Sequence, residues 1–248
     1  MNISEATDSE KTSYQFNVIG TVASCFTQKF TIPRQPGLVK QAKATLTLLP
    51  EYSHPDIVRG LEQYSHIWVI FVFHQSIRSQ WKNTVRPPRL GGNERVGVFA
   101  TRSNFRPNPI GQSVVKLDRV EILSREIKLH LSGIDLLDGT PVLDIKPYVT
   151  YADALVDVEA GMARLPPEKL FNVVFSTLAN EQAKEISGLM GNDFCALIEE
   201  VLSYDMRPAF YKGRNQKKEF HSQLYGYELK WMLGGENITV TDIKKNII

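Results

Sequence analysis

The chain has little cysteine, no long hydrophobic run and no strong excess of either charge. Its 248 residues include two cysteines and carry a formal net charge of +2. Two distant cysteines form no disulfide framework, which favours a reducing, cytoplasmic compartment. The longest apolar run, Ile67 to Phe73, is too short to cross a bilayer, and the polar N-terminus lacks the pattern of a targeting signal. We therefore expect a cytoplasmic protein without a membrane partner.

Several standard catalytic motifs are absent as well. The sequence contains no G-x-G-x-x-G, Walker loop, H-E-x-x-H, C-x-x-C or G-x-S-x-G pattern. A doubly wound dinucleotide-binding sheet is therefore not supported. The five histidines are scattered along the chain and show no ligand spacing, so we predict structural roles for them and no metal site.

Strand patterns dominate the first 150 residues. Short β-type segments are separated by loops rich in proline and glycine, with little room for crossover helices, which predicts an antiparallel barrel. We expect a mainly β protein whose main domain, residues 13–150, is a single-sheeted antiparallel β-barrel, preceded by a flexible tail over 1–12. A helical turn is expected at 55–61 and an ordered excursion at 80–93. The predicted strands cover residues 14–23, 44–49, 67–73, 95–100, 113–123 and 126–131.

The pattern changes near residue 150, where residues 151–167 have the composition of a linker or cover. Two stretches, 177–188 and 193–204, place apolar residues at helical spacing. A terminal hairpin is expected from 225–233 and 238–243, which flank a Gly-Gly-Glu-Asn turn. These elements predict a small α+β domain over residues 151–248.

A proline-braced loop within residues 95–117 presents polar side chains that are suited to recognition. Pro107 and Pro109 restrict the backbone, so the residues before them are held out with little entropy left to lose. Arginine forks suit carboxylates and phosphates, and asparagine amides can pair with an adenine edge. The alternative is a braced hairpin whose arginines are merely solvated. The polar residues of this loop are Arg102, Asn104, Arg106 and Asn108.

The surrounding segment is strongly basic. Residues 78–116 contain eight arginines and lysines and a single acid, Glu94. Such a bias suggests a surface that faces phosphate, although a run of charges is more often a solvated face.

Three further segments place polar groups in tight turns or at a strand end. Residues 33–37, Pro-Arg-Gln-Pro-Gly, form a rigid turn with main-chain donors and the Gln35 amide. His74 and Gln75 end an apolar strand, where the rim of a barrel presents side chains to its mouth. Residues 135–141 combine acids, a glycine and a hydroxyl. Each of these segments is common in proteins, so a functional interpretation depends on their occurring together.

In combination, these segments closely resemble the TrmO / TsaA-like family. The resemblance is carried by residues 33–40, 71–75, 84–92, 95–111 and 138–148, and it is dense over 14–150. It extends more thinly through 205–213, where the family usually reads Asp-Pro-Arg-Pro-Ala-Tyr. Met206 and Phe210 depart from that pattern.

The resemblance implies a barrel that binds S-adenosylmethionine, works as a homodimer and methylates N6 of threonylcarbamoyl-adenosine at position 37 of tRNA, beside the anticodon. Asn104, Arg106 and Asn108 are our choices for the catalytic, substrate-facing residues, on chemical grounds. The implied cofactor contacts are Gln35, Pro36, Gly37, His74, Gln75, Arg102, Gln112, Asp138, Gly139, Thr140 and Pro141.

Two other functions compete with the methyltransferase. A noncatalytic RNA-binding protein would use the same basic face, but it would not require both the Gln-Pro-Gly and the Asp-Gly-Thr-Pro turns. A sensor of S-adenosylmethionine would use the barrel mouth, but it would not require the arginines. The methyltransferase is the hypothesis that uses both sets of residues.

Overall fold

The computed structural model describes residues 13–205 and 219–246. The predicted tail at 1–12 and most of the 205–213 segment lie outside these residues. Within the described part, no helix is long and apolar enough to span a membrane.

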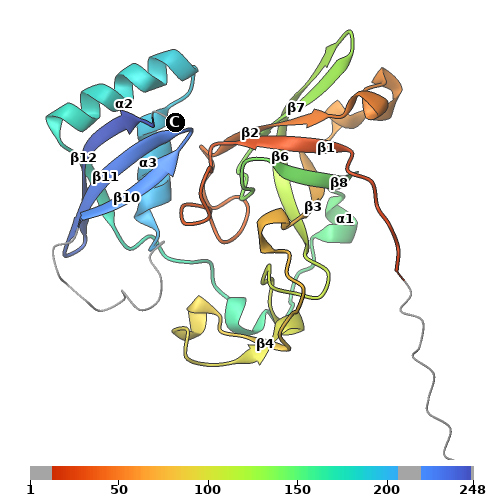
Figure 1. Cartoon of the computed structure of the whole chain (residues 1–248), viewed down its shortest axis with the longest axis horizontal. Helices are drawn as coiled ribbons and strands as arrows, with labels where there is room; N and C mark the ends of the chain where they lie inside the picture. The colour runs from red at the N-terminus through yellow and green to blue at the C-terminus, as the bar shows by residue number, and fades with distance from the viewer. Residues whose placement is uncertain (1–12, 206–218, 247–248) are drawn as a thin grey trace, which may run out of the picture.

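Six antiparallel strands close into a barrel, which confirms the predicted fold class (Figure 1). The strands follow one another around the barrel in the order β1-β2-β7-β6-β3-β8, and β1 closes it by pairing with both β2 and β8. Their bounds are β1 Gly20–Ser24, β2 Lys43–Leu48, β3 His66–Val72, β6 Ile110–Leu123, β7 Glu126–Ser132 and β8 Thr140–Pro147.

The alternating burial of the strands explains why this sequence closes a barrel. Every second residue of β3 is buried, and β2 and β7 show the same period. Apolar side chains such as Leu46, Ile67 and Leu129 are fully buried and fill the interior. The interior of the barrel is therefore filled by apolar side chains, and functional groups are expected in its loops.

Two strand predictions need correction, and one strand of the barrel is missing from the predicted set. The stretch 14–19 alternates apolar and polar residues but stays outside the sheet, because β1 begins at Gly20 and both Tyr14 and Phe16 are largely exposed. The expected strand over 95–100 is reduced to the two-residue β5, Val96–Gly97, which pairs with β4, Thr84–Val85, before a 3-10 turn buries Val98. Strand β8 is absent from the predicted set, since prolines at both ends and Asp144 interrupt its apolar pattern.

The C-terminal domain is α+β, as predicted, with a four-stranded sheet in the order β10-β11-β12-β9. Both predicted helices are present, and each begins at a side chain that accepts a main-chain N–H, Ser176 or Asp193. The bounds are α1 Thr150–Asp153, β9 Asn172–Phe175, α2 Thr177–Met190, α3 Phe194–Ser203, β10 Glu219–Leu224, β11 Tyr227–Gly234 and β12 Asn237–Lys245.

The two domains pack against each other through main-chain and charge-assisted hydrogen bonds. The N–H of Tyr225, in the β10–β11 turn, donates to the carbonyl of Cys25 at 2.9 Å. Glu200 of α3 accepts the N–H of Gln41 at 2.9 Å. The C-terminal domain therefore lies beside the barrel edge from which the β1–β2 connection, residues 25–42, emerges (Figure 1).

Candidate cofactor and substrate site at the barrel mouth

Two glycine-containing turns far apart in the sequence lie side by side. The N–H of Gly37 donates to the carbonyl of Gly133 at 2.8 Å, and both residues have positive φ. A Cβ at Gly133 would sit 3.5 Å from the Cα of Gly37. The Pro-Arg-Gln-Pro-Gly turn and the loop that leads to the Asp-Gly turn are therefore in direct contact, as a shared binding site requires.

The Asp-Gly turn is fastened to the end of β1. Asp138 Oδ1 accepts the N–H of Ser24 at 2.8 Å, and the N–H of Gly139 donates to the carbonyl of Val22 at 2.9 Å. The buried hydroxyl of Thr140 donates to the carbonyl of Leu137 at 2.6 Å. These hydrogen bonds therefore stabilise the conformation of the turn itself. Asp138 and Gly139 are its exposed residues. The neighbouring Pro141 pairs with Thr21 of β1.

Arg102 connects the proline-braced loop to the Gln35 turn. Its Nη1 donates to Gln35 Oε1 at 2.6 Å, across 67 residues of sequence. Because a guanidinium only donates, the oxygen of the Gln35 amide must face it, and the Nε2 donor is the end left for a ligand. Pro36 and Gly37 follow directly, so the predicted contacts of this turn form one surface.

The end of β3 holds the other side of the proline-braced loop. The N–H of Phe73 donates to the carbonyl of Pro109 at 2.7 Å. His74 and Gln75 then enter a short 3-10 turn, where the Gln75 carbonyl accepts Lys29 Nζ at 2.7 Å. This arrangement places the His-Gln pair at the base of the loop that carries Arg102.

The three substrate-facing candidates differ in the hydrogen bonds that their side chains make. Asn104 Nδ2 donates to the buried Ser76 hydroxyl at 2.7 Å, and Arg106 Nη1 donates to the carbonyl of Thr101 at 3.3 Å. The Asn108 side chain is exposed and makes no hydrogen bond within the described residues. The exposed Asn108 amide is therefore available to a ligand, whereas Asn104 and Arg106 brace the loop.

Gln112 is a predicted cofactor contact whose side chain lies on the outer face of strand β6. Its neighbours Gly111 and Ser113 are buried on the inner face of β6, so Gln112 is exposed on the outer face. No hydrogen bond within the described residues ties its side chain to the other predicted contacts.

The sequence reasoning omitted Asp135 from the site, although it lies in one of the quoted segments. Its Oδ1 accepts the hydroxyl of Ser113 at 2.6 Å. Burial raises the pKa of Asp135 to about 6, while the Ser113 hydrogen bond and the positive charge of Arg102 oppose that rise. The fold, and not the sequence pattern, brings this acid next to Ser113 of β6.

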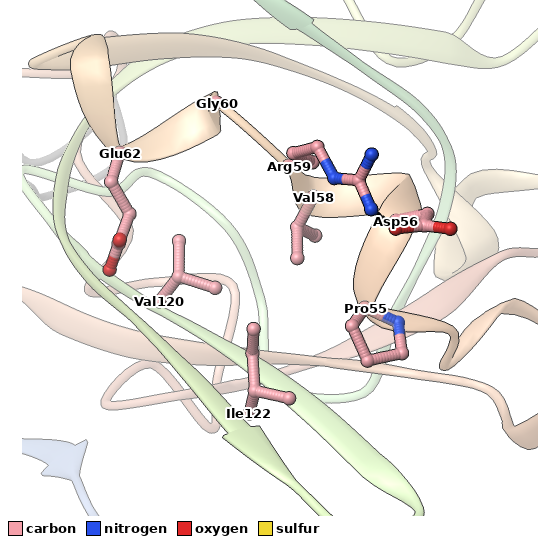
Figure 2. A pocket seen from close by; sticks show the side chains of 8 residues that line it. All are labelled: Pro55, Asp56, Val58, Arg59, Gly60, Glu62, Val120 and Ile122. Atoms are coloured by element: carbon pink, nitrogen blue, oxygen red, sulfur yellow. Dashed lines mark hydrogen bonds and ion pairs between the residues drawn. The ribbon is translucent and has the colours of Figure 1, made fainter.

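The donor set at the mouth matches the polar groups of S-adenosylmethionine. Main-chain donors and Arg102 suit its carboxylate, and the Asp138 carboxylate suits its ammonium or ribose hydroxyls. Within the described residues, no group of three or more His, Cys, Asp or Glu could hold a metal. Figure 2 shows a separate surface cavity of about 230 Å³ beside β6, lined by Asp56, Arg59 and Ile122 among others, and no predicted site residue takes part in it.

Comparisons with known proteins find relatives that match both domains. The model of the tRNA-methyltransferase O N-terminal domain matches residues 21–154, and the TrmO C-terminal domain matches 168–246. A tRNA (adenine(37)-N6)-methyltransferase of Escherichia coli K12 is 46% identical over 219 residues, which cover 88% of this chain and 93% of that protein. A putative S-adenosylmethionine-dependent methyltransferase, RcsF, of Pseudomonas aeruginosa PAO1 is 47% identical and covers 88% and 92%.

Solved structures give the same result. A crystal structure of TrmO from Pseudomonas aeruginosa superposes with a TM-score of 0.80 at 40% identity, covering 96% of this chain and 100% of that one. Sequence, domain order and three-dimensional shape all agree over both domains, and the chain belongs to the tRNA-methyltransferase O family.

Proposed function

We propose that this protein transfers a methyl group from S-adenosylmethionine to N6 of threonylcarbamoyl-adenosine at position 37 of tRNA. Family membership and the 46% identical Escherichia coli tRNA (adenine(37)-N6)-methyltransferase support this reaction. The observation that carries it is the contact between the Gln35 turn and the 133–139 loop, with Arg102 bound to Gln35. That contact supports the proposal because it brings the two predicted turns and one of the predicted arginines together.

The cofactor-facing residues bind and orient. S-adenosylmethionine, when bound, supplies an electrophilic methyl group on a sulfonium. The rigid Gln35-Pro36-Gly37 turn, His74, Gln75 and the exposed Asp138-Gly139 corner are the groups we assign to holding it. Because displacement at the methyl carbon depends on alignment and exclusion of water, no nucleophilic side chain is needed.

The substrate-facing residues recognise a modified adenine. Asn108 offers an amide that can pair with the adenine edge. The threonylcarbamoyl group carries a carboxylate, for which Arg86 and Arg106 are candidate partners. Arg89, a third candidate in sequence, donates to the carbonyls of Leu165 at 2.7 Å and Met162 at 3.3 Å, so it fastens the linker between the domains.

We further propose that the protein works in the cytoplasm as a homodimer, without a metal ion. The small number of cysteines supports the compartment, and the family resemblance supports the dimer. Sedimentation at micromolar concentration tests the oligomeric state. A monomeric, fully active enzyme would contradict it.

Two measurements test the function. Mass spectrometry of anticodon-loop nucleosides, from cells with and without this protein, should show loss of the methylated nucleoside when the protein is missing. Calorimetry with S-adenosylmethionine in a chelator should show unchanged binding. Binding of tRNA without methyl transfer would favour the RNA-binding alternative, and binding of the cofactor with no affinity for tRNA would favour the sensor.

A matched pair of variants separates positioning from recognition in the basic segment. Lys82→Ala removes an exposed charge and should weaken binding of every tRNA modestly, with the salt slope reduced by about one. Arg106→Ala should instead remove the preference for adenine that carries the carboxylate. Equal losses on modified and unmodified tRNA for both variants would contradict this division.

A further inference from the structure

Three aromatic side chains are exposed to solvent within the basic segment of residues 78–116. Phe99 is 73% exposed, Trp81 50% and Phe105 39%. A single exposed ring on a protein surface needs no explanation, but these three share one segment with eight cationic side chains and a single acid. Rings that alternate with cations are the combination that binds single-stranded nucleic acid.

The short ladder of β4 and β5 brings Phe99 and Lys82 to the same end of the two strands. The ladder continues one step beyond its last pair, because the N–H of Val98 donates to the carbonyl of Asn83 at 2.9 Å. The next residues along these two antiparallel segments are Phe99 and Lys82. Lys82 is exposed and makes no hydrogen bond or ion pair within the described residues. An exposed ring and an unpaired cation therefore leave the ladder together.

Arg78 covers one face of the Phe105 ring. The guanidinium carbon lies 4.2 Å from the ring centroid, which is a cation–π contact. The main chain at this point is also held, since the N–H of Phe105 donates to Ser103 Oγ at 3.2 Å. The neighbouring Asn104 donates to the buried hydroxyl of Ser76 at 2.7 Å. Phe105 is therefore fixed from one side, and the face that Arg78 leaves free is the one available to a planar ligand.

Both rings belong to the loop that carries the substrate-facing candidates. Phe99 lies two residues before Thr101, and Phe105 directly precedes Arg106. The carbonyl of Thr101 accepts Arg106 Nη1 at 3.3 Å, which closes the loop between the two rings. Asn108 follows in the same loop. Phe99 and Phe105 are therefore placed on either side of a short, closed turn next to the candidate for the target adenine.

The chemistry of the reaction calls for such rings. An adenine in a tRNA loop must leave its stack before N6 can reach a methyl donor, and the unstacking costs free energy. RNA-binding proteins offset that cost by stacking unpaired bases on aromatic side chains, while nearby cations meet the phosphates. A second copy of this chain fits the surface less well, because a two-fold contact would bring Arg78 and Lys82 toward their own counterparts.

We propose that Phe99 and Phe105 stack on the unpaired nucleotides beside the target adenine, with Arg78 fixing the ring of Phe105 and Lys82 meeting a phosphate. The inference rests on the proposed function, because it takes the tRNA anticodon loop as the ligand. It adds to that function the residues that hold the neighbours of the target base after the stack has opened.

The experiment measures binding of the full chain to an anticodon stem-loop RNA with threonylcarbamoyl-adenosine at position 37, by fluorescence anisotropy at several salt concentrations. Phe99→Ala and Phe105→Ala should each weaken binding about tenfold, the effect of losing one stacked base. The slope of log affinity against log salt should stay as in the wild type, because no phosphate contact is lost, whereas Lys82→Ala reduces it. The affinity for S-adenosylmethionine should not change.

Matched variants separate stacking from the burial of any apolar side chain. Phe99→Leu and Phe105→Leu lack a π face and should bind as weakly as the alanine variants, whereas Phe99→Tyr and Phe105→Tyr should bind like the wild type. Phe16→Ala removes a largely exposed ring outside the basic segment and should have no effect. A fully paired RNA of the same length should bind all of these variants equally, because its bases stay in the stack.

Wild-type affinity for the stem-loop in both alanine variants would overturn the inference, as would an equal loss on paired RNA or full recovery by leucine. A protein that is dimeric in the wild type and monomeric in either alanine variant would also overturn it, because a second copy would then cover the rings. Wild-type protein that binds the stem-loop through these rings but transfers no methyl group would instead overturn the proposed function and leave the stacking in place. The two failures are therefore distinguishable.

Discussion

Gly111 lies so close to the ring of Phe71 that an added Cβ would sit 2.4 Å from its Cζ and 2.9 Å from the Cζ of Phe73. The two rings already meet edge to face at 5.1 Å. This contact lies at the end of β3, next to the hydrogen bond from Phe73 to Pro109 that anchors the proline-braced loop. A glycine in the wall of the barrel thus lies beside the point where the proline-braced loop joins β6.

Gly111→Ala should therefore destabilise the fold and disturb the site together. We expect a loss of about 1–3 kcal/mol in unfolding free energy, the range for overpacking a core. Chemical denaturation measures it. Gly97→Ala is the matched control, because a Cβ there meets nothing within 4 Å and φ is not positive. A Gly111→Ala variant as stable as wild type would show that the rings move aside freely.

Asn108→Ala tests alignment of the target adenine. Its side chain is exposed and makes no hydrogen bond within the described part of the chain, so stability and cofactor affinity should stay unchanged. Single-turnover methylation should fall about a hundredfold, the scale of lost alignment. Unchanged turnover with a lower melting temperature would assign Asn108 a structural role instead.

Glu200→Ala tests the contact between the domains. Its carboxylate accepts the N–H of Gln41 at 2.9 Å, and removing it leaves that donor unpaired. We expect the unfolding free energy, measured by thermal denaturation, to fall by about 1–2 kcal/mol. Glu199→Ala, on the exposed face of the same helix, should leave the unfolding free energy unchanged. Equal effects of the two substitutions would mean that the Gln41 contact contributes nothing.

Cys25 should resist alkylation until the protein unfolds. Burial raises the pKa of its thiol to about 12, so the reactive thiolate is scarce at pH 8. The raised value also means that folding retains this proton, and stability should decline as pH rises above about 9. In a Cys195→Ser background, mass spectrometry after iodoacetamide treatment should find Cys25 unmodified in native protein and modified in denaturant. Rapid modification of native Cys25 would contradict its burial.

The strands that could be predicted are those whose burial follows a simple period, such as β3, whose residues 67–72 belong to an unbroken run of seven apolar or aromatic residues that ends at Phe73. The stretch 14–19 alternates apolar and polar residues, yet its main chain meets the neighbouring strands through Ile19, which bonds to Val142 and Leu49. Periodicity does not reveal such pairing. Strand β9 has only four residues and pairs in parallel with β12, more than sixty residues later. Short segments that depend on distant partners carry too little local signal.

The candidate site also has features that the sequence predicts and features that it does not. Glycine and proline mark the turns at Gly37 and Gly139 because their conformations are local. The hydrogen bonds from Arg102 to Gln35 and from Ser113 to Asp135 join residues that are far apart in the sequence. The sequence therefore indicated polar residues of the site without their partners. Gln112 rests on the same resemblance, yet strand alternation turns it to the outer face of β6.

The hydrogen bond from Ser24 to Asp138 joins residues 114 positions apart and exists only once β1 has closed the barrel. The turn that we assign to the cofactor is thus completed by a contact of long sequence separation, which has a high cost in loop-closure entropy. A ligand that requires this turn binds native chains and ignores unfolded ones, and at one hundred times its dissociation constant it adds about 2.7 kcal/mol of stability. Cellular supply of the methyl donor would then govern how long each molecule survives proteolysis, as well as how fast it works.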